Sequence, residues 1–364
     1  MPEGDTIFRT ARALERALGG KSVTRFETNV AKLASVNDDA PIVGRTVTKV
    51  EARGKWCLIH FSAMPLKPGG DAQRLPVLEA HEDTTDASVD EQEAVATSAQ
   101  PSEGGNHRIG SRYAGPLVLL THMLMSGSWH LYRVGERWRL PRAMMRCEIT
   151  CGDFVAIAFN VQVTEFHTER SLARYSMVPK LGVDVLGEEW TVQKGIAALE
   201  ERKRTYPDDE IALVLLNQRV MAGLGNVYKS EVAFAAGVNP FRRMSTITQR
   251  EMRAMAEFSE KWMKVNVNER SQRGESGEGI VTYSGPRRTA HTSNREDRTW
   301  VYGRQGMECR RCGAIVERRL QGEQARPTYW CPQCQPWIPA AGQSAVAPTG
   351  RSAKLLGPRR KIGC

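Results

Sequence analysis

The sequence predicts an α+β fold, with β-strands in its first half, helices in its second half and a small metal-binding module near its C-terminus. Three observations support this prediction. Short apolar runs separated by turn residues fill much of the first 160 residues. From about residue 190 the apolar positions recur at helical spacing. Four of the eight cysteines gather between residues 309 and 334.

Composition favours a protein with a polyanionic partner, most simply nucleic acid. The 364 residues carry a formal net charge of +10 and are long enough for two domains. No run approaches the roughly 18 apolar residues of a membrane span, and no signal peptide opens the chain, so no membrane partner is expected. The cysteine pattern favours a metal site in a reducing compartment over a disulfide framework. We expect an intracellular monomer, cytoplasmic or nucleoid-associated.

The N-terminal part, residues 2–165, is predicted to be mainly β-structure. A first helix follows Asp5, because Ile7, Ala11, Leu14 and Leu18 fall on one face. Strands are predicted at 23–28, 46–52, 56–61, 117–123, 128–133, 143–150 and 154–159. Short strands with Gly, Pro, Asn and Asp between them favour an antiparallel sandwich or barrel.

Two segments are predicted to be disordered. Residues 65–113 hold 4 Lys or Arg against 9 Asp or Glu and few large apolar residues, which indicates an acidic insertion between two strands. Residues 337–364 carry five basic residues and no acidic ones. A basic tail of this kind adds weak electrostatic attraction to DNA.

After a linker at 166–205, residues 206–300 are predicted to form a helical domain. Helices are expected from Asp208 to Leu216, from about Val227 to Ala236, and over 249–265. The run Gly223-Leu224-Gly225-Asn226 lies between the first two. Glycines before a helix let the backbone approach an anion, and the helix N-terminus then offers free amides. This pattern fits a phosphate-binding helix–two-turns–helix, in which Asn226 adds a donor; an ordinary helix hairpin is the alternative.

The most specific local pattern lies in residues 301–336. Cys309 and Cys312 form one close pair, and Cys331 and Cys334 form a second pair 18 residues further on. This is the spacing of a four-cysteine zinc site, in which two pairs bind one Zn²⁺ and the intervening residues form a hairpin. Arg326 and several other arginines make it a basic finger.

Two further features carry potential chemistry. Once Met1 is removed, Pro2 presents a secondary amine whose pKa of about 8 leaves part of it neutral and nucleophilic. Such an amine attacks a sugar aldehyde carbon to form an iminium, and Glu3 lies beside it to move protons. Lys55 follows a predicted strand at a tight turn, from which it could reach a cleft. Taken alone, each feature is more often without function.

Together these motifs resemble the formamidopyrimidine-DNA glycosylase/endonuclease VIII family. The similar segments are PEGDT at the start, EARGKWCLIHF at 51–61, THMLMSGSW at 121–129, QRVMAGLGNVYKSE at 218–231, and WVYGR leading into CRRC…RPTYWCPQC. They occur in the family's order along almost the whole chain. The start and the last segment resemble the endonuclease VIII branch more than the branch that excises oxidised guanine.

The resemblance implies an N-terminal β-sandwich flanked by helices, a helix–two-turns–helix domain with a zinc finger, and double-stranded DNA bound between them. Pro2 corresponds to the family's Schiff-base nucleophile and Glu3 to its proton donor at the sugar. Lys55 corresponds to a general acid/base and phosphate contact. Asn226 and Arg326 correspond to the pair that binds the phosphates flanking the lesion, and Arg326 also to the proton donor in the later elimination.

The loop at Leu124, Met125 and Ser126 corresponds to the side chains that the family inserts where a nucleotide has been everted. A damaged base must leave the stack before its sugar can be attacked, and an apolar side chain such as Met125 would fill the gap. The sequence departs from the family in three ways. Asp5-Thr6 stands where many relatives carry a second carboxylate, Ser126 is small for an inserted residue, and the insertion and tail lie outside the pattern.

The function implied is that of a bifunctional DNA glycosylase and abasic-site lyase. It would remove oxidised bases, most simply pyrimidines, and cut the strand by β,δ-elimination. Two alternatives stay open at this point. One is a non-catalytic zinc-finger protein that binds damaged or bent DNA. The other is a glycosylase for oxidised purines.

Overall fold

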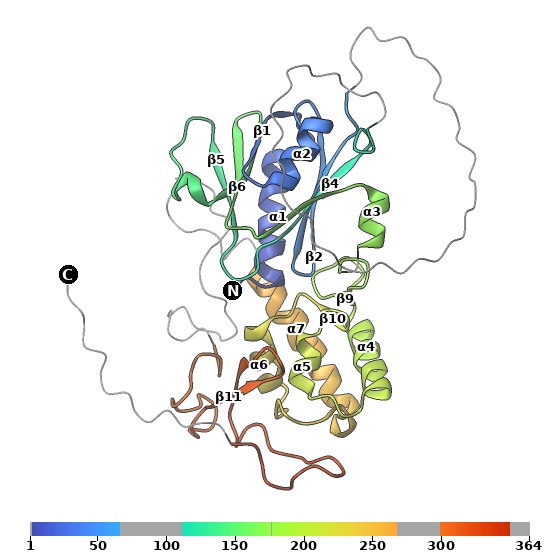
Figure 1. The fold of residues 1–364 in the computed structure, drawn as a ribbon. Helices are drawn as coiled ribbons and strands as arrows, with labels where there is room; N and C mark the ends of the chain where they lie inside the picture. The colour runs from blue at the N-terminus through green and yellow to red at the C-terminus, as the bar shows by residue number, and fades with distance from the viewer. Residues whose placement is uncertain (1, 66–110, 176, 268–298, 350–364) are drawn as a thin grey trace, which may run out of the picture.

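The chain has two lobes, a strand-rich one and a helical one, and the N-terminus lies where they meet (Figure 1). This computed structural model describes residues 2–65, 111–175, 177–267 and 299–349. The predicted α+β class is confirmed. Most of the predicted insertion, the end of the predicted tail and residues 268–298 of the predicted helical domain lie outside the described residues.

The strand-rich lobe is a sandwich of two antiparallel four-stranded sheets. One sheet has the order β1-β6-β7-β5 and the other β2-β3-β4-β8. The strands are β1 (Val23–Thr28), β2 (Val47–Arg53), β3 (Trp56–Phe61), β4 (Leu117–His122), β5 (Ser128–Arg133), β6 (Met145–Cys151), β7 (Phe154–Phe159) and β8 (Val163–His167). A short 3-10 turn, Arg142–Met144, precedes β6.

Helix α1 (Gly4–Leu18) contacts strands of both sheets and shares their core. Ile7, Leu14 and Leu18 are at most 1% exposed. The outer face of β3 and β4 is covered by α3 (Glu169–Arg174) and the segment after it. Helix α2 (Ala31–Asp39) packs on β8 and β1. Helix α1 therefore places the N-terminus at the end of the sandwich that meets the helical lobe (Figure 1).

Arg45 connects the segment before residues 66–110 to the segment after them. Its guanidinium is buried and donates hydrogen bonds to the carbonyl oxygens of Pro41, Ser62, Tyr113 and Gly115 at 2.6–2.9 Å. Burial lowers the Arg45 pKa to about 10. The sandwich is therefore closed at this edge by residues on both sides of that segment.

The helical lobe consists of α4 (Val192–Thr205), α5 (Ile211–Leu216), α6 (Asn226–Ala235) and α7 (Gln249–Val267). A second 3-10 turn spans Met244–Thr246. Strands β9 (Val183–Asp184) and β10 (Met221–Ala222) pair in parallel and lead toward the sandwich. Helix α4 packs on α7, so the end of the segment predicted as a linker forms part of this lobe.

The C-terminal finger contains the antiparallel hairpin β11 (Glu317–Gln321) and β12 (Arg326–Trp330). It packs on α6 through β12. The glutamate Glu231 on α6 anchors the start of the finger, because its carboxylate accepts backbone hydrogen bonds from Trp300, Val301 and Tyr302 at 2.7–2.9 Å.

Among the described residues, none of the helices has the length and apolar character needed to cross a membrane.

Candidate active site

The N-terminal residues are inserted into the glycine turn that precedes α6. Pro2 and Glu3 are buried. The Gly4 amide donates to the Gly223 carbonyl at 2.8 Å, and one Glu3 carboxylate oxygen accepts from the Val227 amide at 3.0 Å. The Glu3 carboxylate thus lies at the N-terminus of α6, where the helix dipole stabilises negative charge.

This close approach explains the glycines of the turn. A Cβ atom at position 225 would lie 2.2 Å from Cδ of Glu3, and one at position 4 would lie 2.7 Å from Cα of Gly223. Gly223 also has a φ of +101°, a conformation that L-residues with a side chain rarely adopt. The helix N-terminus predicted to face a phosphate therefore holds Glu3 in this structure.

Lys55 lies in the tight turn between β2 and β3, and that turn docks on the helical lobe. The Gly54 amide donates to Asp184 Oδ2 at 2.6 Å. Gly54 has a φ of +58°, and a Cβ there would lie 3.1 Å from Cβ of Ala222. The Lys55 side chain is half-buried.

Gly223 is the point at which these two segments meet. The Cβ position of Gly54 is 3.6 Å from the Gly223 nitrogen, and Gly4 bonds to the Gly223 carbonyl. The structure therefore brings the Pro2-Glu3 segment and the Lys55 turn to the same glycine turn, although they are about 50 residues apart in the sequence.

The loop after β4 presents apolar side chains to solvent. Leu124 is 37% exposed and Met125 is 65% exposed, and Ser126 is also exposed. Leu124 has a φ of +48°, and its amide donates to His122 Nδ1 at 3.1 Å. The His122 ring packs against Trp56 with 4.7 Å between ring centroids. The loop is thus connected through His122 to the strand that follows Lys55.

Asn226 and Arg326 are brought together by the contact between α6 and β12. Asn226 is buried, and its Nδ2 donates to the Pro327 carbonyl at 2.9 Å. An amide nitrogen carries two hydrogens, so one donor position is left for an anion. The Arg326 guanidinium donates to Gln324 Oε1 at 2.9 and 3.1 Å.

Lys229 on α6 is fully buried against β12. Its Nζ donates to Thr328 Oγ1 at 2.7 Å. Burial, together with the positive charge of Arg326, lowers the Lys229 pKa to about 7, while the carboxylate of Glu3 opposes this shift. The charges of Arg326 and Glu3 are therefore both close enough to influence one buried amine.

The four cysteines of the finger converge on one point. Their Sγ atoms all lie within 4.8 Å of one another, and the Cys309–Cys334 and Cys312–Cys331 pairs are 3.9 and 3.5 Å apart. A tetrahedral Zn²⁺ with Zn–S bonds of about 2.3 Å needs sulfurs about 3.8 Å apart. All four are free thiols, so the donor set and its geometry fit a closed metal site.

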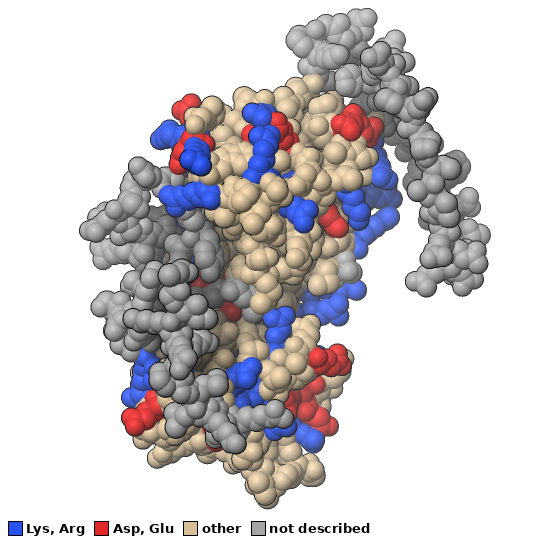
Figure 2. Space-filling model, turned by 60° about the vertical axis from the view of Figure 1, so that its left-hand side comes forward, with Lys and Arg blue, Asp and Glu red and all other residues tan. Residues whose placement is uncertain are grey.

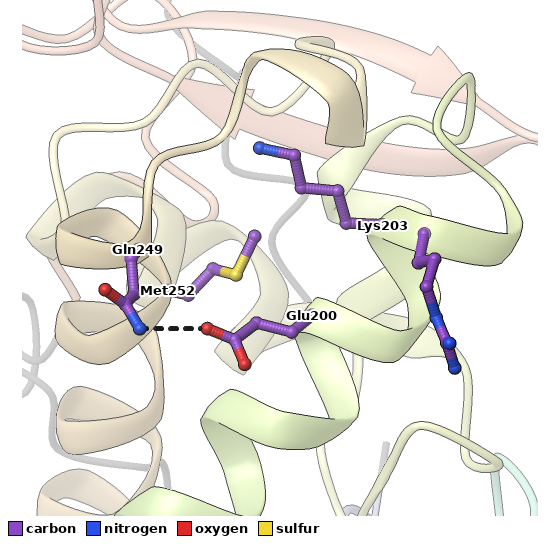
Figure 3. A pocket seen from close by; sticks show the side chains of 5 residues that line it. Glu200, Lys203, Gln249 and Met252 are labelled. Atoms are coloured by element: carbon purple, nitrogen blue, oxygen red, sulfur yellow. Dashed lines mark hydrogen bonds between the residues drawn. The ribbon is translucent and has the colours of Figure 1, made fainter.

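Charged side chains lie on the surface around the junction. Figure 2 shows Lys and Arg side chains on both lobes and around the level where the lobes meet. A different hollow, of about 410 Å³, lies between α4 and α7 and is lined by Glu200, Lys203, Arg204, Gln249 and Met252 (Figure 3). None of the predicted site residues lines it, so it is separate from the arrangement described above.

Three residues at the site were not predicted from the sequence. Asp184 holds the Lys55 turn, and burial raises its pKa. Burial and the Lys55 charge lower the pKa of His122 to about 4, so it stays neutral and can accept from Leu124. Lys229 is the third. Asp184 was detectable as a lone acid in the apolar run LGVDVL, but nothing in the local sequence marks His122 or Lys229 as buried at this site.

Fold and site together define a two-lobed protein in which an N-terminal Pro-Glu pair meets a helix–two-turns–helix beside a four-cysteine finger. Residues 1–164 match the model of the formamidopyrimidine-DNA glycosylase N-terminal domain, and residues 181–275 match that of the formamidopyrimidine-DNA glycosylase H2TH domain. The chain therefore belongs to the formamidopyrimidine-DNA glycosylase/endonuclease VIII family.

Known proteins of this kind match over nearly their whole length. A probable endonuclease 8 2 of Streptomyces coelicolor is 29% identical, with 96% of this chain and 99% of the relative covered. The DNA-(apurinic or apyrimidinic site) lyase Nei2 of Mycolicibacterium smegmatis is 28% identical over 92% of this chain and 99% of the relative. Among solved structures, Lactococcus lactis Fpg in complex with abasic-site DNA has a TM-score of 0.62 at 17% identity, covering 92% of this chain and 100% of that chain.

Proposed function

We propose that this protein is a bifunctional DNA glycosylase and abasic-site lyase of base excision repair. The observation that carries the proposal is the burial of Pro2 and Glu3 in the glycine turn between the lobes, next to the Lys55 turn. The absence of side chains at Gly4, Gly223 and Gly225 leaves room for the Pro2-Glu3 segment to lie in this turn. Relatives named endonuclease 8 and abasic-site lyase, with which the chain aligns end to end, support the same activity.

In the proposed reaction the Pro2 nitrogen attacks C1′ of the damaged nucleotide. The glycosidic bond breaks, the base leaves with a proton, and the sugar ring opens to an iminium on Pro2. The iminium acidifies the C2′ proton, whose removal expels the 3′ phosphate by β-elimination. A second elimination expels the 5′ phosphate. Hydrolysis of the remaining iminium frees Pro2.

Each predicted site residue has a distinct role in this scheme. Glu3 moves the proton at the sugar, and Lys55 acts as general acid/base and contacts a phosphate. Asn226 and Arg326 bind the phosphates that flank the lesion, and Arg326 also donates a proton in the later elimination. Leu124, Met125 and Ser126 fill the gap left by the everted nucleotide, which suits the exposure of Leu124 and Met125.

Cys309, Cys312, Cys331 and Cys334 would hold one structural Zn²⁺. Four thiolates leave no open coordination position, so the ion supplies folding energy to the finger and activates no water. Its contribution is to fix the hairpin that carries Arg326.

The proposed substrate is double-stranded DNA with an oxidised pyrimidine or an abasic site. Duplexes with thymine glycol, dihydrouracil, oxidised cytosine or oxidised guanine, each assayed for base release and strand cleavage, test this directly. We expect the oxidised pyrimidines to be released fastest. Pro2→Gly should release every one of these bases far more slowly than the wild type. Preference for oxidised guanine would reassign the protein to purine repair. Binding of all duplexes without release of any base would favour the non-catalytic alternative.

A further inference from the structure

A buried polar network joins the two lobes directly behind the site. Tyr228 on α6 donates its hydroxyl to Asp5 Oδ2 on α1 at 3.1 Å. The same hydroxyl accepts from Asn266 Nδ2 on α7 at 2.9 Å. Asp5 and Tyr228 are fully buried, and Asn266 is 7% exposed. We propose that Tyr228 is a positioning residue that fixes the N-terminal amine against the glycine turn before α6, with Asp5 and Asn266 holding its hydroxyl.

The network crosses the boundary between two separate cores. Helix α1 belongs to the core of the sandwich, whereas Tyr228 lies in the core of the helical lobe. Each partner is also close in sequence to residues that the proposed reaction uses. Asp5 is three positions after Pro2, and Tyr228 directly follows Val227, whose amide holds Glu3. The Tyr228 hydroxyl therefore connects the segment that carries the proposed nucleophile to the helix that carries Asn226.

The hydrogen bonds also have a fixed direction. The Asp5 carboxylate accepts only, so the Tyr228 hydroxyl must donate to it and must accept from Asn266. The Asn266 amide donates further to the Trp262 carbonyl at 2.9 Å, and Asp5 Oδ1 accepts from the Thr6 amide at 2.8 Å. Directional bonds of this kind define one relative placement of α1, α6 and α7, which apolar contacts alone would define less sharply.

A buried carboxylate is costly unless it is fully hydrogen-bonded, and apolar residues could fill the same space. The position of Asp5 in the first turn of α1 reduces that cost through the helix dipole. Accurate placement brings a benefit at this location, because an error of about 1 Å between reacting groups can slow a reaction about 100-fold.

The inference rests on the proposed function for its kinetic part, and Tyr228→Phe is the informative variant. It removes one oxygen atom and keeps the ring. The matched control is Tyr132→Phe. Tyr132 is also buried, and its hydroxyl accepts from the Arg139 amide and bonds to His130 Nδ1, but within the sandwich alone. Both variants lose a buried hydroxyl, and only one loses the connection between the lobes.

The rate of borohydride-trapped complex formation and the Kd are measured on one abasic-site duplex. We expect Tyr228→Phe to form the complex about 10- to 100-fold more slowly with a Kd within about threefold of wild type, and Tyr132→Phe to keep the wild-type rate. A Tyr228→Phe rate no lower than that of Tyr132→Phe would overturn the inference. Failure of the wild-type protein to trap at all would instead overturn the proposed function.

Hydrogen exchange without DNA tests the placement independently of activity. Amides in residues 4–10 and 225–230 should exchange faster in Tyr228→Phe than in Tyr132→Phe. Unchanged exchange in both segments would show that the hydroxyl does not hold the lobes together.

Discussion

Single residues determine how closely the two lobes approach at the site. Gly4, Gly223 and Gly225 let Glu3 reach the Val227 amide, because a side chain at position 225 would occupy the space of the Glu3 carboxylate. The carboxylate is held by the α6 N-terminus before any DNA arrives. Its position is therefore set in the free protein, which is the condition for a proton-transfer group to act without reorganisation.

Replacement of Glu3 by glutamine should separate the two proposed activities. The amide oxygen of the introduced side chain can still accept from Val227, so DNA binding should persist, but the proton donor is lost. We expect release of an oxidised pyrimidine to fall about 100-fold or more, while cleavage at a preformed abasic site is retained because the base has already left. Parallel assays on one lesion duplex and one abasic duplex check this, and lesion release at the wild-type rate would remove Glu3 from the mechanism.

Lys229 should make the stability of the protein depend on pH. Its folded-state pKa of about 7 lies below the ordinary lysine value of 10.5, so between these values the unfolded chain binds more protons than the folded one. Stability should therefore rise with pH across that window, and the cost of burying the charged amine is fully present below about pH 7. Denaturant unfolding at pH 7, 8 and 9 should show the free energy of unfolding of the wild type rising with pH relative to that of Lys229→Met. A difference that stays constant with pH would contradict the assignment.

At the scale of elements, the finger and α6 act as one unit. Asn226, Lys229 and Glu231 project from α6 to the finger, where they bind Pro327, Thr328 and the amides of residues 300–302. The hairpin that carries Arg326 is therefore oriented from one side by α6 and from the other by the cysteine cluster.

Loss of the metal should accordingly affect DNA binding more than folding of the sandwich. We expect about one zinc per chain, and Cys331→Ser should lose it and bind an abasic duplex at least about 10-fold more weakly. Cys147→Ala is the control, because Cys147 is a buried free thiol in β6 outside the cluster. Metal analysis and fluorescence anisotropy measure the two effects. Unchanged affinity and cleavage in verified zinc-free protein would show that the finger is dispensable.

The elements differed in how well the sequence predicted them. The first seven strands of the sandwich were predicted within about two residues because each combines apolar or β-branched residues with clear turn signals. Strand β8 (Val163–His167) was missed, since it is short and its burial depends on pairing with β4. Helix α2 was missed because only Leu33 and Val36 of its nine residues are buried.

At the scale of the whole molecule, the site exists only because distant segments meet. Local pattern and resemblance identified Pro2, Glu3, Lys55, Asn226 and Arg326 as candidates, and their chemical roles stay predictions. Neither could show that the N-terminus and the Lys55 turn share Gly223, or that Asp184 and Tyr228 connect the lobes. Such contacts depend on how the two cores are placed relative to one another. The spacing of apolar residues within one segment carries no information about that placement.

If the mature N-terminal proline is the nucleophile, Pro2 is the residue that becomes covalently linked to the DNA, and this link can be identified. The protein is incubated with an abasic-site duplex, reduced with borohydride and digested, and the cross-linked peptide is sequenced by mass spectrometry. We predict one cross-link, on the nitrogen of Pro2 in a chain that has lost Met1. Pro2→Gly should form a cross-link far more slowly than the wild type. A cross-link on Lys55 or Lys229, or efficient trapping by a chain that retains Met1, would rule out Pro2 as the nucleophile.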